Sequence, residues 1–204
     1  MIAVGVIILI VAMVVTVLLL SQKAKGTTVT VPASFPWRGR YDALIFAEAT
    51  AAGIEPALLK AIVSKESGFD STAINPEKTF TLAGRTYAPG DALGRAALRE
   101  AILQGFDPLS IGVNPSIGLA QVRVTTARDV LPGVTAQRLF DPQTNLRASA
   151  LYLAWLFRQG FAVEQIDAYN VGPGALRAGT RNQSYRDRVL SLRATYLNDF
   201  PQEA

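Results

Sequence analysis

The chain has 204 residues, with 20 Lys and Arg against 16 Asp and Glu, and it contains neither cysteine nor histidine. This length suits one domain of ordinary size with a short appendage, and the missing residue types exclude disulfides, thiolate or imidazole metal sites, cysteine nucleophiles and histidine bases. The formal net charge of +4 is not gathered in a dense basic block, so nucleic acid is not expected as a partner.

An apolar run without any charged residue occupies residues 2–20, IAVGVIILIVAMVVTVLLL. At ~1.5 Å per residue, a helix of this length crosses the hydrocarbon core of a bilayer. A cleaved signal peptide is the alternative, but its basic residues usually precede the apolar run. Here Lys23 and Lys25 follow the run. We therefore predict a retained transmembrane anchor over residues 1–21 that contacts a lipid bilayer through residues 2–20.

Residues 22–40 mix Thr, Ser, Pro and basic residues without helical periodicity, which predicts a linker. The basic residues of this segment are Lys23, Lys25, Arg38 and Arg40. The positive-inside rule favours a cytoplasmic location for such a segment, so any function outside the cytoplasm conflicts with that rule.

From residue 41 onward the pattern is helical, and we predict a mainly α domain over residues 41–204. The first helices are predicted over 41–52, ended by Gly53, and over 56–67, ended by Gly68. Alternating residues on either side of Ala83-Gly84 predict a small hairpin within residues 77–90. Further helices are predicted over 91–104, from 125 or 126, over 142–159, 162–169 and 184–197, with Asp91, Asp141 and Ser184 as N-terminal caps.

Glu66 continues the apolar stripe of the second predicted helix, whose other members are Leu58, Leu59, Ile62 and Val63. Burial and the partial negative charge of a helix C-terminus both disfavour an ionised carboxylate, and a raised pKa suits a general acid. From this stretch alone, an exposed glutamate paired with Lys60 or Lys65 is the more ordinary interpretation.

Two later motifs change this interpretation. The sequences ESGF at 66–69, GLAQ at 118–121 and AYNVG at 168–172 resemble, in the same order, three motifs of the lytic transglycosylases of the soluble (SLT) type, which are relatives of goose-type lysozyme. Those motifs read approximately Glu-Ser-x-Phe, Gly-Leu-Met-Gln and Ala-Tyr-Asn-x-Gly, and Tyr185 is a fourth match before the last helix. The resemblance covers about residues 41–197 and implies a lysozyme-like, mainly helical fold.

The resemblance also implies an activity, which is cleavage of the β-1,4 bond between N-acetylmuramic acid and N-acetylglucosamine in peptidoglycan, with a 1,6-anhydro product. Glu66 would be the catalytic acid and then the base. The implied substrate-binding residues are Ser67, Gln121, Tyr169, Asn170 and Tyr185. Tyr185 would also hydrogen-bond Glu66, and Ser67 would either orient substrate or cap the helix. Neither a metal nor a cofactor is implied.

The chain departs from the family pattern in two places. Ala120 stands where the family usually has Met, which would remove a large side chain from the wall of the cleft. An insertion at about residues 77–115 would lie next to the cleft as a lid, a specificity element or a docking surface. Asp70 is the nearest candidate for a second carboxylate, and we expect it to be structural.

Two other functions stay open at this stage. One is hydrolysis by a goose-type muramidase, and the other is a membrane-anchored docking protein on a decayed transglycosylase scaffold. Because the implied substrate lies outside the cytoplasmic membrane, we expect a single-pass membrane protein whose domain faces the periplasm and cell wall, or a protein of a phage virion membrane. Further partners would then be components of a virion or of an envelope-spanning machine.

Overall fold

The computed structural model describes residue 29 and residues 38–201, and residues 38–201 belong to one compact unit. The anchor predicted over residues 1–21 lies outside the described residues, and so does most of the linker predicted over 22–40. None of the helices in the described part of the chain combines the length and hydropathy that a bilayer span needs.

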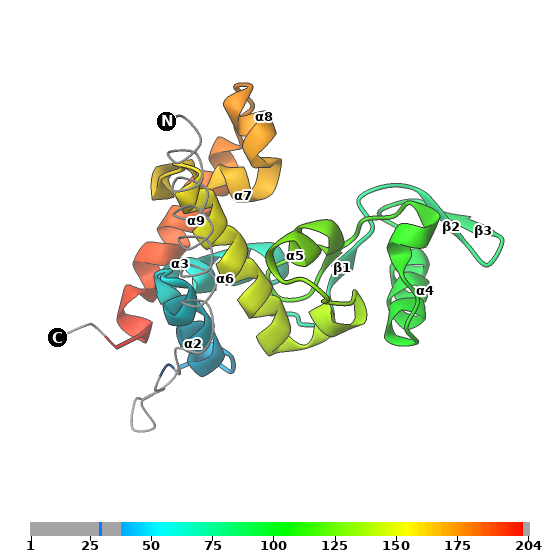
Figure 1. Cartoon of the computed structure of the whole chain (residues 1–204), viewed down its shortest axis with the longest axis horizontal. Helices are drawn as coiled ribbons and strands as arrows, with labels where there is room; N and C mark the ends of the chain where they lie inside the picture. The colour runs from blue at the N-terminus through cyan, green and yellow to red at the C-terminus, as the bar shows by residue number, and fades with distance from the viewer. Residues whose placement is uncertain (1–28, 30–37, 202–204) are drawn as a thin grey trace, which may run out of the picture. The chain divides into compact units, whose positions relative to one another are not determined.

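Helices dominate the described residues, as the sequence predicts (Figure 1). The elements follow in the order α2 (Asp42–Ala52), α3 (Pro56–Ser67), β1 (Ile74–Asn75), β2 (Phe80–Leu82), β3 (Arg85–Tyr87), α4 (Ala92–Leu103), η1 (Pro108–Ile111), β4 (Ser116–Ile117), β5 (Val122–Arg123), α5 (Val124–Val130), η2 (Gln137–Phe140), α6 (Pro142–Arg158), η3 (Val163–Gln165), α7 (Asp167–Val171), α8 (Pro173–Arg177), α9 (Gln183–Tyr196) and η4 (Leu197–Asp199), where η marks a 3-10 helix.

Helix α3 is the central element of the core. It packs most extensively against α9, while α2 packs against both α3 and α6 (Figure 1). Every residue from Ala57 to Val63 is buried, because neighbours cover α3 on more than one side. Burying each of its large aliphatic side chains contributes about 1.5–3 kcal/mol, so this helix holds a large share of the stability.

Capping residues define most helix boundaries where the sequence predicted them. Gly53 and Gly68 adopt the left-handed conformation that ends α2 and α3, and the side chain of Asp91 accepts hydrogen bonds from the first turn of α4. Asp141 accepts a hydrogen bond from the Thr144 N–H in the same way at the start of α6. These four predictions are confirmed.

The C-terminal third differs from the prediction in three respects. The helix predicted over 162–169 is wrong in detail, because i→i+3 hydrogen bonds close the separate 3-10 turn η3 before α7 begins at Asp167. Helix α8 was not predicted at all. Asn182, rather than Ser184, caps α9, because its side chain accepts the hydrogen bond from the Tyr185 N–H.

A small antiparallel sheet, in the order β1-β4-β5, joins segments that the sequence analysis treated as loops. Its register pairs Ile74 with Ile117 and Asn75 with Ser116, and then Ser116 with Arg123. Strands of two residues are too short to display an alternating pattern, so the sequence could not indicate them.

The insertion leaves the sheet after β1 and returns to it at β4, so its two ends meet through strand pairing. Within it, β2 and β3 form the predicted hairpin, which turns at Ala83 and Gly84, both with positive φ. Helix α4 contacts β3 and β1, and its Gly94 allows the ring of Tyr87 to lie against the helix backbone. The hairpin and the helix predicted within residues 77–115 are both confirmed.

Candidate active site

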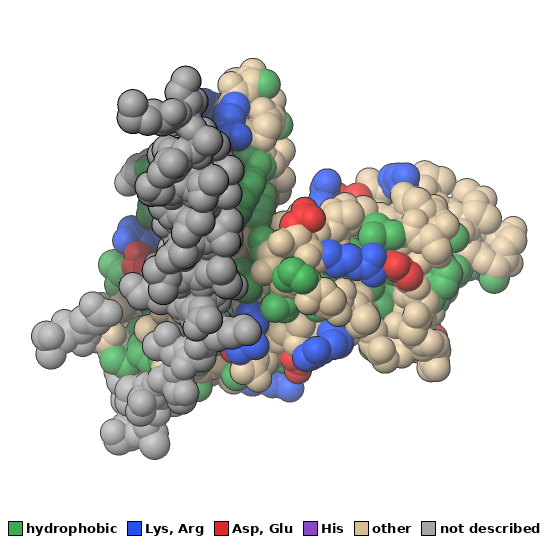
Figure 2. Space-filling model, viewed as in Figure 1, with side chains coloured by type: hydrophobic (Ala, Val, Ile, Leu, Met, Phe, Trp, Pro, Cys, Tyr) green, Lys and Arg blue, Asp and Glu red, His purple; other side chains and the backbone are tan. Residues whose placement is uncertain are grey.

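A cavity of about 430 Å³ opens at the C-terminal end of α3, which is within the usual range for small-ligand sites. Figure 2 shows a recess in the surface between the part formed by α7 and α8 and the part formed by α5. The residues that line the cavity are Glu66, Asn75, Glu77, Ser116, Gln121, Val122, Arg123, Thr126, Tyr152, Tyr169, Asn170, Val171, Gly172 and Pro173.

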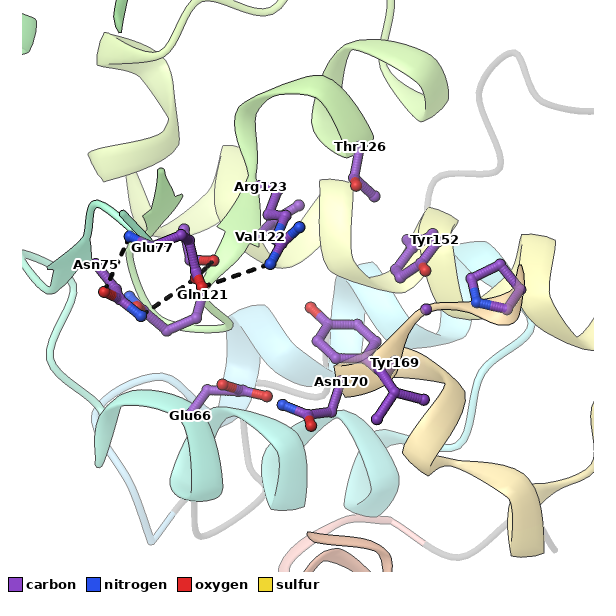
Figure 3. Close-up of a pocket in the computed structure, with 14 residues that line it drawn as sticks. Glu66, Asn75, Glu77, Gln121, Val122, Arg123, Thr126, Tyr152, Tyr169 and Asn170 are labelled. Atoms are coloured by element: carbon purple, nitrogen blue, oxygen red, sulfur yellow. Dashed lines mark hydrogen bonds and ion pairs between the residues drawn. The ribbon is translucent and has the colours of Figure 1, made fainter. Parts of the chain in front are cut away.

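Glu66 lies in the last turn of α3, where the buried stripe of that helix reaches the cavity. The helix ends one residue later because Gly68 takes a φ of 60°. The side chain of Glu66 is half-buried, and Figure 3 shows its carboxylate directed toward the side chain of Asn170. The position that helical periodicity indicated is therefore both partly desolvated and open to a ligand.

The environment of Glu66 favours its protonated form. Burial is the largest influence, and it raises the pKa of this carboxyl above the ordinary 4.5. The buried Tyr185 of α9 donates a hydrogen bond to Glu66 Oε1 at 2.7 Å, which lowers the pKa, as does the charge of Lys65. The charge of Glu77 raises it. The net result is a raised pKa, which is the property that a general acid needs near neutral pH.

The turn formed by Gly118–Gln121 is held in place by Asn145, a fully buried residue of α6. Asn145 Nδ2 donates to the carbonyls of Ile117 and Leu139 at 2.7 and 2.8 Å, and its Oδ1 accepts from the Ala120 N–H at 2.9 Å. The side chain of Asn145 in α6 therefore holds the turn in its conformation.

Gln121 and Asn170 place two primary amides at the cavity. Gln121 Nε2 donates to the Gly118 carbonyl at 2.9 Å, and Asn170 Oδ1 accepts from Asn182 Nδ2 at 2.8 Å. Within the described ranges, Gln121 Oε1 and Asn170 Nδ2 make no hydrogen bond. One free acceptor and one free donor suit a ligand that carries secondary amide groups.

Tyr169 of α7 combines a structural hydroxyl with a ring that lines the cavity. The hydroxyl donates to the Ala120 carbonyl at 3.0 Å and lies 3.0 Å from Ser149 Oγ. Burial raises the pKa of this phenol far above 10, so it stays neutral. The ring packs against Tyr152 of α6 with centroids 5.4 Å apart, and together the two rings form an aromatic side of the cavity.

Ser67, Ala120 and Asp70 were singled out from the sequence but do not line the cavity. The hydroxyl of Ser67 donates to the Leu119 carbonyl at 2.7 Å and so connects α3 to the 118–121 turn. Ala120 is fully buried, so the departure from Met changes the packing beneath the cavity and not its wall. Asp70 Oδ1 accepts hydrogen bonds from the N–H and hydroxyl of Thr72, a structural role of the kind expected for it.

Of the six predicted site residues, Glu66, Gln121, Tyr169 and Asn170 line one cavity, and Tyr185 contacts Glu66 from behind it. Sequence analysis missed Tyr152 and a polar cluster of Asn75, Glu77, Ser116 and Arg123. The members of that cluster lie at the two ends of the insertion and come together through the pairing of β1, β4 and β5. In the sequence, only their position beside the inserted segment could have indicated them.

In the part of the chain that the structure describes, no group of three Asp or Glu side chains is placed to hold a metal ion. The groups that line the cavity are two carboxyls, three primary amides, two aliphatic hydroxyls, a guanidinium and two tyrosine rings.

Comparison with known proteins gives a family and a fold. The model of the transglycosylase SLT domain matches residues 43–190. The search of curated proteins returned no match. Among solved structures, the chain is similar to the X-ray structure of an inactive mutant of the lytic transglycosylase Slt from Pseudomonas aeruginosa, with a TM-score of 0.53 and 23% sequence identity.

That match covers 81% of this chain and 25% of the other, so the chain spans about a quarter of that protein's length. A likeness at this level of identity establishes the fold alone. The mainly helical, lysozyme-like fold that the motifs predicted is confirmed by it, together with the family match.

Proposed function

We propose, since this chain belongs to the family of transglycosylase SLT domains, that it cleaves the glycan strands of peptidoglycan with Glu66 as the general acid. The observation that carries the proposal is the half-buried carboxyl of Glu66, which has a raised pKa, accepts a hydrogen bond from Tyr185 and opens onto a polar cavity. A protonated carboxyl at such a position can deliver a proton to a bound glycosidic oxygen.

The bond cleaved would be the β-1,4 bond between N-acetylmuramic acid and N-acetylglucosamine. Glu66 gives its proton to the glycosidic oxygen while the bond from that oxygen to C1 breaks. The resulting carboxylate then takes the proton of the muramic 6-hydroxyl, whose oxygen bonds to C1 and closes a 1,6-anhydro ring. Glu66 ends the cycle protonated, and no water is consumed.

This scheme needs one carboxylate, unlike the paired carboxylates of most glycosidases. The arrangement of the other acids supports it. The carboxylate of Glu77 accepts hydrogen bonds from three side chains, and Asp70 does not line the cavity. The free amide groups of Gln121 and Asn170 would bind the N-acetyl groups of the sugars.

The test is the clearing of purified peptidoglycan in a gel by the wild-type domain and by Glu66→Gln. We expect the substitution to reduce the rate by about a thousand-fold or more, since a general acid and a general base are lost together. Glu100→Gln, at an exposed position on α4, is the matched control and should retain full activity. Equal clearing by Glu66→Gln would contradict the assignment of the acid.

Mass spectrometry of the released fragments separates the proposed lyase from a goose-type muramidase. The anhydro product is lighter than the hydrolytic product by one water molecule. A wild-type protein that releases no fragments at all would instead favour the alternative of a docking protein on a decayed scaffold.

We also propose that residues 2–20 anchor the domain at a bilayer, with the domain facing the cell wall or carried in a virion membrane among components of a larger machine. The support is the uncharged length of this run. Protease added to intact membranes should digest the domain if it faces outward, and full protection of the domain would contradict this orientation.

A further inference from the structure

We propose that Glu77, the first residue of the insertion, is a positioning residue for Glu66, because it places a fixed negative charge at the same cavity and so favours the protonated form of the acid. Arg123 pairs with Glu77 at 3.4 Å and lines the same cavity, so its positive charge would oppose this effect. The inference rests on the proposed function, in which a protonated Glu66 is the active form.

The carboxylate of Glu77 is fixed by one side chain from each strand of the small sheet. Ser116 of β4 donates to Oε1 at 2.6 Å, and Asn75 of β1 donates to the same oxygen at 3.2 Å. Arg123 of β5 contacts Oε2 at 3.4 Å. All three groups are donors, so the carboxylate of Glu77 is held from three sides.

The backbone of Glu77 is fixed as well. Its φ of 68° lies in the left-handed region, which is uncommon for a residue with a side chain. The Glu77 N–H donates to Asn75 Oδ1 at 3.2 Å, a local turn that supports this conformation. A strained backbone together with three donors leaves the carboxylate little freedom to move. Such a fixed position is expected of a group that acts on Glu66 through its charge.

Glu77 and Glu66 line the same cavity but come from different segments (Figure 3). Solvent reaches the Glu77 side chain, which is 31% exposed, so the interaction between the two carboxyls across this cavity is screened and its effect is modest. Consistent with this geometry, the charge of Glu77 raises the pKa of Glu66.

Other groups around Glu66 also bear on its protonation. Lys65 of α3 favours the ionised form, and so does the hydrogen bond from the Tyr185 hydroxyl. Tyr169 and Tyr152 are partly buried, and the loss of hydration raises the pKa of both phenols, so they remain neutral. Of these groups, Lys65 and Tyr185 lie beside Glu66 itself, whereas Glu77 and its ion-pair partner Arg123 belong to other segments of the cavity lining.

The two members of the pair should therefore act with opposite signs. Removing the charge of Glu77 leaves Arg123 unopposed, which favours ionised Glu66 and should move the alkaline limb of kcat/KM to lower pH. Removing the charge of Arg123 leaves Glu77 unopposed and should move the same limb to higher pH. A role in holding the sheet together would lower activity without any such pair of opposite shifts.

The experiment measures peptidoglycan release against pH for Glu77→Gln, Arg123→Gln and the double variant. We expect shifts of about half a pH unit in opposite directions, with the double variant close to wild type. Glu77→Asp keeps the charge and should keep the limb in place even if the rate falls. Glu100→Gln and Arg188→Gln, both exposed and neither in the cavity lining, are the matched controls.

A second readout does not depend on activity. Titration of the Glu66 side-chain carbon by ¹³C NMR, assigned with Glu66→Gln, should show the same opposite shifts in the two single variants. Unchanged titration, or shifts in the same direction, would overturn the inference. Opposite shifts in a protein that releases no peptidoglycan would sustain it while overturning the proposed function. If Glu77→Gln does not fold, the Arg123→Gln variant tests the inference by itself, and Glu66 should then titrate at a higher pH than in wild type.

Discussion

At the scale of single residues, Glu66 combines two opposing influences. Burial at the end of α3 disfavours its charge, while the Tyr185 hydroxyl and Lys65 favour it. Burial prevails, so the folded protein holds a proton on Glu66 at pH values where the unfolded chain has released it. Under the proposed function, activity and stability are linked through one carboxyl group.

A stability measurement tests this balance. Because the pKa of Glu66 is raised on folding, its favourable contribution is complete below about pH 4.5, the ordinary value, and is lost as the pH rises through the folded-state pKa. Glu66→Gln cannot ionise, so it should match wild type at pH 4 and exceed its thermal midpoint by about a few degrees at pH 8.

Thermal unfolding at the two pH values provides the measurement, with Glu100→Gln as the exposed control. A difference from wild type that is the same at both pH values would show that the carboxyl is not destabilised by burial.

At the scale of elements, the turn between β4 and β5 depends on an exact fit to α6. Gly118 has a φ of 74°, and a Cβ added there would lie 2.6 Å from the Leu139 carbonyl and would collide with the Asn145 side chain. Asn145 supplies the three hydrogen bonds that hold the turn. A glycine is therefore required for both conformation and space.

Two glycine substitutions separate these requirements. Gly133→Ala introduces a side chain at a φ of 83° with no atom within 4 Å of the added Cβ, and should cost about 1–2 kcal/mol from backbone strain alone. Gly118→Ala should cost about 2–4 kcal/mol more, because it also displaces Asn145 and leaves buried polar groups without partners. Denaturant unfolding measures both, and equal losses would contradict the proposed fit.

At the scale of the whole domain, a buried lysine connects distant parts of the chain. Lys60 of α3 lies 2.7 Å from Asp42 at the start of α2 and 2.8 Å from Asp199 near the C-terminal end. All three residues are buried, and Arg38 approaches Asp199 from the surface at 3.3 Å. The helix that carries Glu66 is thereby attached to both ends of the domain.

Lys60→Met should destabilise the domain by about 3–5 kcal/mol, since it removes the buried cation that Asp42 and Asp199 share and leaves only the exposed Arg38 beside Asp199. Lys78→Met, at an exposed position of the insertion, should change stability by less than about 0.5 kcal/mol. Urea unfolding of the two variants gives the comparison. A Lys60→Met variant as stable as the Lys78→Met control would show that the buried cluster contributes nothing.

The sequence by itself determined most of the helices, among them the one that carries the candidate acid, although it missed α8 and the division between η3 and α7. Apolar periodicity and capping residues act between near neighbours, so Gly53, Gly68, Asp91 and Asp141 could be recognised without knowledge of the fold. The phase of α3 placed Glu66 on its buried side, and the motifs at 118–121 and 168–172 supplied the two amides and the tyrosine that line the same cavity.

Only the tertiary structure decided which other residues face Glu66. Strands of two residues are too short to show an alternating pattern. β1, β4 and β5 form only because β1 pairs with β4 across the insertion and β4 pairs with β5. Glu77 and Arg123 lie 46 positions apart and meet through that pairing alone. Ser67 and Ala120, both in motifs, proved to lie behind the cavity, because exposure to a cavity is a property of the whole packing arrangement and not of a local pattern.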